Sequence, residues 1–130
     1  MQQVRFLSVD NVFRIHEETI ACEGGAGGIR DLGLLTSAVA MPRQRFGGKY
    51  LHPDLSAMAA AYLYHLCVNH PFVDGNKRVA AITSLIFLAE NGVPLEVDED
   101  VLYETVMAVA AGRLSKSVLT DWFRRQTGQG

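Results

Sequence analysis

The amino-acid sequence predicts an all-α protein, a compact six-helix bundle with at most one small β-hairpin. Apolar residues recur at three- and four-residue spacing along most of the chain, as in helices that bury one face. Clusters of glycine and proline divide these stretches into pieces of helical length. Apolar residues make up 48% of the 130, which is enough for a real core. We therefore expect residues 1–130 to form a single domain.

The first two predicted helices are marked by their capping residues. Ser8 can cap a helix that reaches about residue 20, and Asp31 can cap a shorter helix that Pro42 ends. Residues 23–28, between them, contain four glycines and should form a loop. The positions that share one face of the first helix are Val9, Val12, Phe13, His16 and Ile20. This face should pack on the rest of the bundle.

The segment between Pro42 and Pro53 has turn chemistry and basic charge but no helical period. Phe46, Tyr50 and Leu51 could form a short hairpin in it. A third helix should then run from about residue 54 to residue 69 and stop before the next proline.

The fourth predicted helix begins near residue 75 or 76 and ends at about residue 90, where Asn91-Gly92 can close it. Apolar side chains surround most of its circumference, so we expect it to be the buried centre of the fold. These side chains are Val79, Ile82, Leu85, Ile86, Leu88 and Ala89.

Two more helices complete the prediction. Residues 98–100 place negative charge at the start of the fifth helix, where the helix dipole favours it. Ser115 or Ser117 opens the sixth. Residues 93–97 are the one other strand-like stretch, and Pro94 suits a sheet edge at best.

Composition and charge narrow the classes of function. A net charge of −2 supplies no strong basic field for nucleic-acid binding. The chain holds no apolar run of the roughly 18 to 20 residues that a membrane helix needs, and its start lacks the apolar run of a signal peptide. Cys22 and Cys67 are expected to be buried free thiols. We therefore expect a soluble, cytoplasmic protein without direct nucleic-acid or membrane binding.

Most of the chemically suggestive residues fall in residues 70–78, which read His-Pro-Phe-Val-Asp-Gly-Asn-Lys-Arg. His70 lies at the carboxyl end of the third helix, and imidazole changes charge near neutral pH. It is therefore a candidate general base, although a histidine that only caps helix carbonyls would look the same. Phe72 should insert into the core and anchor the loop.

The second half of this window predicts a phosphate site. Glycine permits close backbone approach, and the helix that follows presents unpaired N–H groups. A carboxylate there would repel phosphate unless a cation lay between them, so Asp74 is a candidate Mg²⁺ ligand as well as a candidate helix cap. Lys77 and Arg78 would place two cations in the first turn of this helix, where they oppose the helix dipole. That arrangement is unfavourable unless an anion binds beside them. The candidate phosphate ligands are Gly75, Asn76, Lys77 and Arg78.

This window resembles the signature of the Fic/Doc family, roughly His-x-Phe-x-Asp/Glu-Gly/Ala-Asn-Gly/Lys-Arg. The likeness extends to residues 24–35, to the basic segment before the third helix and to the end of the fourth helix. It implies a small helical bundle that uses ATP or a related nucleotide to modify protein hydroxyl groups. Many members transfer AMP and carry glycine where this chain has Lys77. In having lysine at this position, the chain resembles the Doc branch of the family. Doc proteins are toxins that transfer the γ-phosphoryl group to a threonine of elongation factor Tu and halt translation.

The resemblance also assigns roles to individual residues. His70 would deprotonate the target hydroxyl, and Asp74 would hold Mg²⁺. Asn76 and Arg78 would orient the phosphates, while Lys77 neutralises charge that develops during transfer. The catalytic set would be His70, Lys77 and Arg78.

Two further segments carry expectations from the resemblance. Residues 43–50 correspond to the family's flap, which aligns the target chain by strand-like pairing, although an ordinary surface loop would also fit. Its candidate docking residues are Arg43, Arg45, Lys49 and Tyr50. Fic proteins can be silenced by a helix with Ser/Thr-x-x-x-Glu-Gly/Asn, and residues 19–24, Thr-Ile-Ala-Cys-Glu-Gly, match that short string. A Doc-like toxin is more typically silenced by a separate antitoxin protein.

Three other readings stay open or are weak. One is an AMP transferase, against which Lys77 argues. Another is a non-catalytic module that only binds partner proteins. A metal site built from His65 and His70 is weak, because their spacing of five residues places them on poorly matched helix faces.

Overall fold

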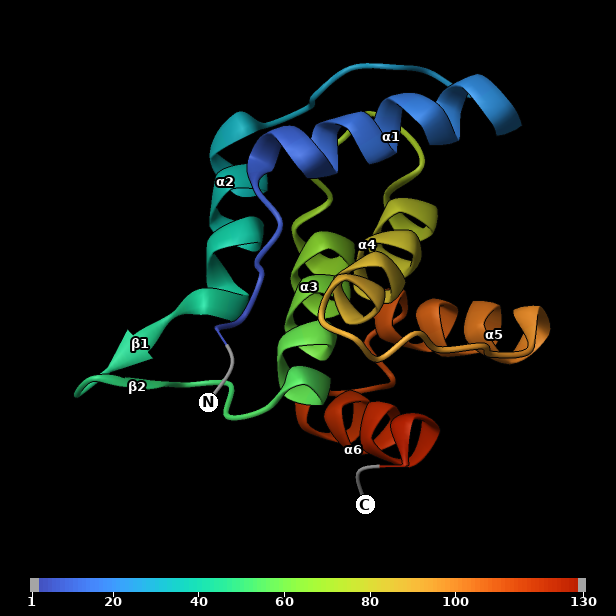
Figure 1. Ribbon diagram of the computed structural model, residues 1–130. Coiled ribbons are helices and arrows are strands. Elements are labelled where there is room, and N and C mark those ends of the chain that lie inside the picture. Colours follow the sequence, from blue (N-terminus) through green and yellow to red (C-terminus); the bar gives the residue numbers. More distant parts are fainter. Residues whose placement is uncertain (1–2, 129–130) are drawn as a thin grey trace.

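Residues 3–128, as described by a computed structural model, fold into six α-helices and one small hairpin, which confirms the predicted all-α class (Figure 1). In chain order the elements are α1 (Val9–Glu23), α2 (Leu32–Ala40), the 3-10 turn η1 (Met41–Arg43), β1 (Arg45–Phe46), β2 (Lys49–Tyr50), α3 (Leu55–Asn69), α4 (Asn76–Glu90), α5 (Glu99–Ala110) and α6 (Lys116–Thr127). The predicted helix boundaries agree with these within a few residues.

Helix α3 occupies the centre of the bundle, and α2, α4, α5 and α6 all pack against it. Tyr62, Leu63 and Leu66 on this helix are almost completely buried. Four alanines between residues 57 and 61 are also buried, and their small side chains let neighbouring helices approach closely. The central helix is therefore α3.

The expectation that α4 is the buried centre is wrong. Val79 and Leu88 are fully buried, but Ile82, Leu85 and Ile86 are only half-buried, and Ala89 is exposed. The half-buried residues line a cavity between α1, α4 and α5, which explains why an apolar face of α4 is left without a complete cover.

Side-chain caps fix the starts of most helices. Ser8, Asp31, Asp54 and Ser115 each accept a backbone N–H from the first turn of the helix that follows. Ser115, and not Ser117, therefore opens α6. Helix α4 differs, because it begins at a glycine and no side chain caps it.

The predicted hairpin forms between β1 and β2, which are antiparallel with Arg45 opposite Tyr50 and Phe46 opposite Lys49. Gly47 has φ of 59° and Gly48 has φ of 80°, the positive values that a two-residue hairpin turn needs. The hairpin projects from the side of the bundle (Figure 1). Residues 93–97 form no strand and connect α4 to α5 as irregular chain.

The two cysteines differ in their exposure to solvent. Cys67 is buried, but Cys22 is exposed beside the cavity along α1, so the prediction of two buried thiols is wrong for Cys22. Within the described residues, no helix is both long and apolar enough to cross a membrane.

Candidate active site

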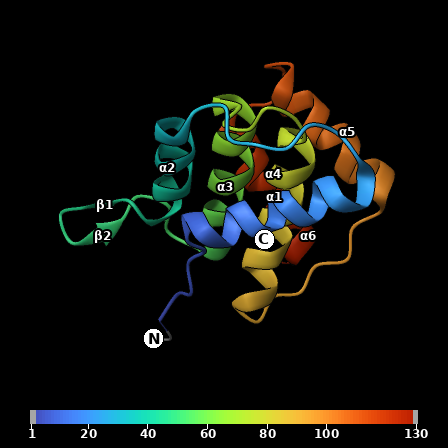
Figure 2. The same cartoon turned by 90° about the horizontal axis from the view of Figure 1, so that it is seen from above.

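The window at residues 70–78 forms the connection between α3 and α4 and the first turn of α4. The connection between α1 and α2 passes across it, as the view from above shows (Figure 2). Ile29 and Phe72 form an isolated antiparallel bridge, and the N–H of Val73 donates to the carbonyl of Gly28 at 3.1 Å. The extended segment of residues 28–31 therefore lies across the window and holds it through backbone hydrogen bonds.

Phe72 anchors the window in the core, as predicted, and it is 0% exposed. Its ring stacks on the imidazole of His16, with centroids 3.9 Å apart and planes 5° from parallel. Nε2 of His16 lies 2.9 Å from the carbonyl oxygen of Asp74. Because a carbonyl can only accept, that nitrogen must carry the hydrogen. His16 on α1 thus fixes both the ring and the backbone of the window.

Asn76 closes the window onto itself. Its side-chain Oδ1 accepts from the N–H of Phe72, and its Nδ2 donates to the carbonyl of the same residue, both at 2.9 Å. The side chain is 5% exposed. The amide of Asn76 therefore holds the loop, and the group that remains for a phosphate is its backbone N–H in the first turn of α4.

His70 ends α3 as predicted, with its side chain exposed. Its φ is 52°, a left-handed conformation that no other non-glycine residue adopts among residues 3–128. This conformation is disfavoured for a residue with a Cβ, so the surroundings must hold it. Nε of Arg30 donates to the carbonyl of His70 at 2.7 Å, and Nη2 donates to that of Asn69 at 3.0 Å.

Asp74 presents an exposed carboxylate at the mouth of the site and does not cap α4. One oxygen accepts from the N–H of Gly75 at 2.9 Å, and the other accepts from the N–H of Ala26 at 3.3 Å. A Cβ at Gly25 would lie 2.7 Å from that second oxygen, so only glycine allows this approach.

The start of α4 has the features of an anion site. Gly75 is its N-cap with φ of 79°, and no side chain bonds to the first turn. The helix therefore leaves its first N–H groups available, and its dipole favours a negative ligand there. Lys77 is exposed in the same turn.

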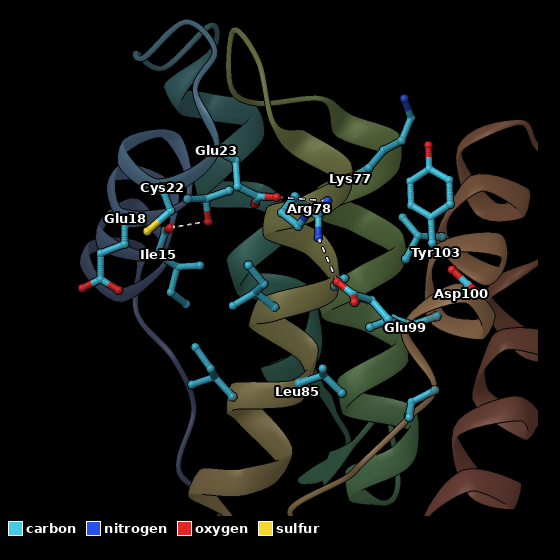
Figure 3. A pocket seen from close by; sticks show the side chains of 17 residues that line it. Ile15, Glu18, Cys22, Glu23, Lys77, Arg78, Leu85, Glu99, Asp100 and Tyr103 are labelled. Atoms are coloured by element: carbon cyan, nitrogen blue, oxygen red, sulfur yellow. Dashed lines mark hydrogen bonds and ion pairs between the residues drawn. The ribbon is translucent and has the colours of Figure 1, made fainter.

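Arg78 is bound to carboxylates, as the close view shows (Figure 3). Its Nη2 lies 3.0 Å from Oε1 of Glu23 on α1, and its Nη1 lies 3.9 Å from Oε1 of Glu99 on α5. Glu23 is the glutamate of the 19–24 string, and Thr19 of that string is buried with its hydroxyl on the carbonyl of Ile15. The string therefore forms the last part of α1.

A cavity of about 880 Å³ extends from this ion pair between α1, α4 and α5. Of the window, only Lys77 and Arg78 line it, and its other charged lining residues are acidic: Glu18, Glu23, Glu99 and Asp100. Four carboxylates would repel a polyphosphate. Phosphate binding therefore fits the start of α4, and not the length of this cavity.

Away from the window, the ammonium group of Lys116 contacts two histidines. Its Nζ lies 3.2 Å from Nε2 of His52 and 3.2 Å from Nε2 of His65. Burial, followed by the charge of Lys116 and the nearby His52, lowers the pKa of His65 to about 4. The described residues include no group of three or more His, Cys, Asp or Glu that could hold a metal. His65 is thus engaged by Lys116.

Of the four predicted docking residues, Arg45, Lys49 and Tyr50 lie in the hairpin and Arg43 ends the turn η1 before it. The guanidinium of Arg45 lies 4.4 Å from the ring centroid of Tyr50, and that of Arg43 lies 5.1 Å from the centroid of Phe6. Lys49 is exposed. Phe46, which the sequence argument named for the hairpin but not for docking, is 80% exposed.

Sequence reasoning missed His16 and Arg30 as site residues. A signal existed for both: His16 is the polar member of an otherwise apolar helix face, and Arg30 lies in the 24–35 stretch that carried part of the resemblance. Neither signal names a partner, because those partners lie 58 and 40 residues away in the sequence.

The Fic/DOC family matches residues 6–88, and the chain belongs to this family. The chain is 30% identical over 125 residues to "Protein kinase doc" of Escherichia phage P1, covering 96% of this chain and 98% of that protein. It is 47% identical over 78 residues to "Toxin Doc" of Mycolicibacterium smegmatis (strain ATCC 700084 / mc(2)155), covering 60% of each chain. Both relatives are Doc proteins, so the chain falls in the Doc branch of the family.

Proposed function

We propose that this protein is the toxin of a toxin–antitoxin pair, and that it transfers the γ-phosphoryl group of ATP to a threonine hydroxyl of elongation factor Tu, which halts translation. The observation that carries the proposal is Lys77, exposed in the first turn of an uncapped helix at the position where AMP-transferring members have glycine. The names of the two relatives, a toxin and a protein kinase, support the same conclusion.

The residues of the window suit phosphoryl transfer, which needs positioning and charge stabilisation more than covalent catalysis. His70 takes the proton of the threonine hydroxyl, whose oxygen bonds to the γ-phosphorus. The bond from that phosphorus to the bridging oxygen breaks, and ADP leaves. The N–H groups at the start of α4, with Lys77, stabilise the charge on the transferring group.

ATP and Mg²⁺ fit the donor set of the site. Asp74 offers the hard oxygen ligand that Mg²⁺ prefers, and its carboxylate is exposed. One carboxylate is a weak site by itself, so phosphate oxygens of the nucleotide and water would have to supply the other ligands. Bound there, Mg²⁺ would neutralise phosphate charge beside Asp74.

The decisive experiment uses ATP labelled separately at the γ- and the α-phosphate. Purified protein, Mg²⁺ and elongation factor Tu should yield a γ-labelled factor, and His70→Ala should reduce the label to a small residual level. Transfer of the α-label would support an AMP transferase instead. No label from either ATP, together with growth arrest that survives His70→Ala, would support a non-catalytic binding module.

The target and the antitoxin need their own test. Mass spectrometry of cellular proteins after expression should find one added phosphate on elongation factor Tu, while an added AMP would contradict the proposal. Co-expression of the product of the neighbouring gene should relieve growth arrest if it is the antitoxin. Continued arrest would count against that partner.

A further inference from the structure

We infer that Arg30 is a positioning residue that holds His70 in its left-handed conformation and thereby aims the catalytic base. The guanidinium of Arg30 binds the last two carbonyls of the α3 terminus, those of Asn69 and His70, at 3.0 and 2.7 Å. This inference rests on the proposed function only in so far as His70 is the base.

The geometry explains why an arginine is needed there. Carbonyls at the end of a helix have no partners within the helix, and a cation is favoured beside them. A planar guanidinium can donate to two carbonyls at once, whereas an ammonium is a single point charge. The interaction of Arg30 with both carbonyls therefore fixes the direction in which the chain leaves α3.

The backbone of Arg30 is held in the same place as its side chain. Its N–H and that of Asp31 both donate to the carbonyl of Pro71, at 2.7 and 3.0 Å. The side chain of Asn69 donates to the carbonyl of Leu34 at 3.0 Å. Arg30 and its neighbours thus contact the chain on both sides of His70, which over-determines the disfavoured backbone.

Arg30 makes none of its three hydrogen bonds with α4. Its effect should therefore fall on the base and not on the phosphate site. Loss of a residue that only stabilised the fold would instead lower the amount of active protein. The molecules that remained folded would keep both the ATP dissociation constant and the transfer rate of wild type.

The test combines Arg30→Ala with His70→Ala in a double-mutant cycle. We expect Arg30→Ala to slow single-turnover transfer by about 10- to 100-fold, while the ATP dissociation constant stays within about twofold of wild type. In the His70→Ala background the same change should alter the residual rate by less than about twofold, because the two residues act as a unit. Additive losses would overturn the inference.

Two further variants sharpen the result. Arg30→Lys keeps the charge without the planar fork and should recover only part of the rate. Arg113→Ala, which removes an exposed arginine beyond α5, is the matched control and should keep the wild-type rate. A rate for Arg30→Ala equal to that of the control would contradict the inference.

One readout does not depend on catalysis. In wild type the Cα chemical shift of His70 should report a left-handed residue, and in Arg30→Ala it should move away from that value. An unchanged shift would overturn the positioning role. If wild type transfers no phosphate, the proposed function fails while this measurement still decides the part that Arg30 plays.

Discussion

Glu23 at the end of α1 forms an ion pair with Arg78 in the first turn of α4, with 3.0 Å between Oε1 and Nη2. The Glu23 side chain is 42% exposed and that of Arg78 is 44% exposed, so water screens the pair and its contribution to folding is small. Its importance lies in competition, because a phosphate that binds Arg78 must displace a carboxylate that already holds it.

Glu23→Gln should therefore raise the affinity for ATP with Mg²⁺ by about two- to fivefold, the range that an exposed ion pair can account for. Calorimetric titration would measure the dissociation constant. Glu17→Gln changes the same charge on the exposed side of α1 and should leave it unchanged. Equal affinities in both variants would show that Glu23 does not compete, and would remove the physical basis for silencing by the 19–24 string.

Phe46 should be the main contact of the hairpin with the target, because an exposed aromatic ring supplies large contact area at low entropic cost. Phe46→Ser should raise KM for elongation factor Tu by about tenfold, with the ATP dissociation constant unchanged. Val118→Ser, on the exposed face of α6, is the control. If Phe46→Ser changed ATP affinity and left KM for the target alone, the hairpin would not be a docking element.

The features that the sequence predicted are local ones. Ser8 and Asp31 mark helix starts because a capping side chain binds a backbone N–H within three residues. The proline after His70 ends α3 because proline restricts the backbone of the residue directly before it. Phe72 was placed in the core correctly because a large apolar ring has few alternatives in a polar loop.

The features that it missed depend on contacts between distant segments. The stacking of His16 on Phe72 requires α1 to lie against the window, and an apolar pattern gives the face of α1 but not what covers it. The error about α4 has the same origin, since Ile82 is as apolar as a core residue but faces a cavity. The pairing of Glu23 with Arg78 also joins two helices far apart in sequence.

Acid should destabilise the protein through the pair His52 and His65. Burial, followed by the charge of Lys116, lowers the pKa of both, and for His65 the value is about 4 against 6.5 for the free side chain. Below pH 6.5 these two histidines therefore bind protons more readily in the unfolded chain than in the folded protein. The stability that these neutral imidazoles contribute is fully present above pH 6.5 and is lost as the pH falls toward 4.

Urea unfolding between pH 4.5 and 7.5 would measure this loss, with a slope of at most about 1.4 kcal/mol per pH unit for each imidazole. His65→Phe should flatten the dependence. Lys116→Met should flatten it only in part, because burial is the larger cause and remains. A wild-type slope that His65→Phe left intact would assign the acid sensitivity to other groups.

The proposed function assigns to Lys77 the choice between γ-phosphoryl transfer and AMP transfer, and two substitutions separate the charge of this residue from its size. Lys77→Met keeps the bulk and removes the cation, so γ-phosphoryl transfer should fall by about 10- to 100-fold if charge stabilisation is its role. Lys77→Gly also opens space at the start of α4, at a cost of about 1 kcal/mol in helix stability. It should show the same loss and, because AMP-transferring members have glycine there, a gain of label from the α-phosphate. Undiminished γ-transfer in Lys77→Met would mean that the charge of Lys77 does not act on the transferring group, and the preference for phosphoryl transfer would then have to come from its bulk alone.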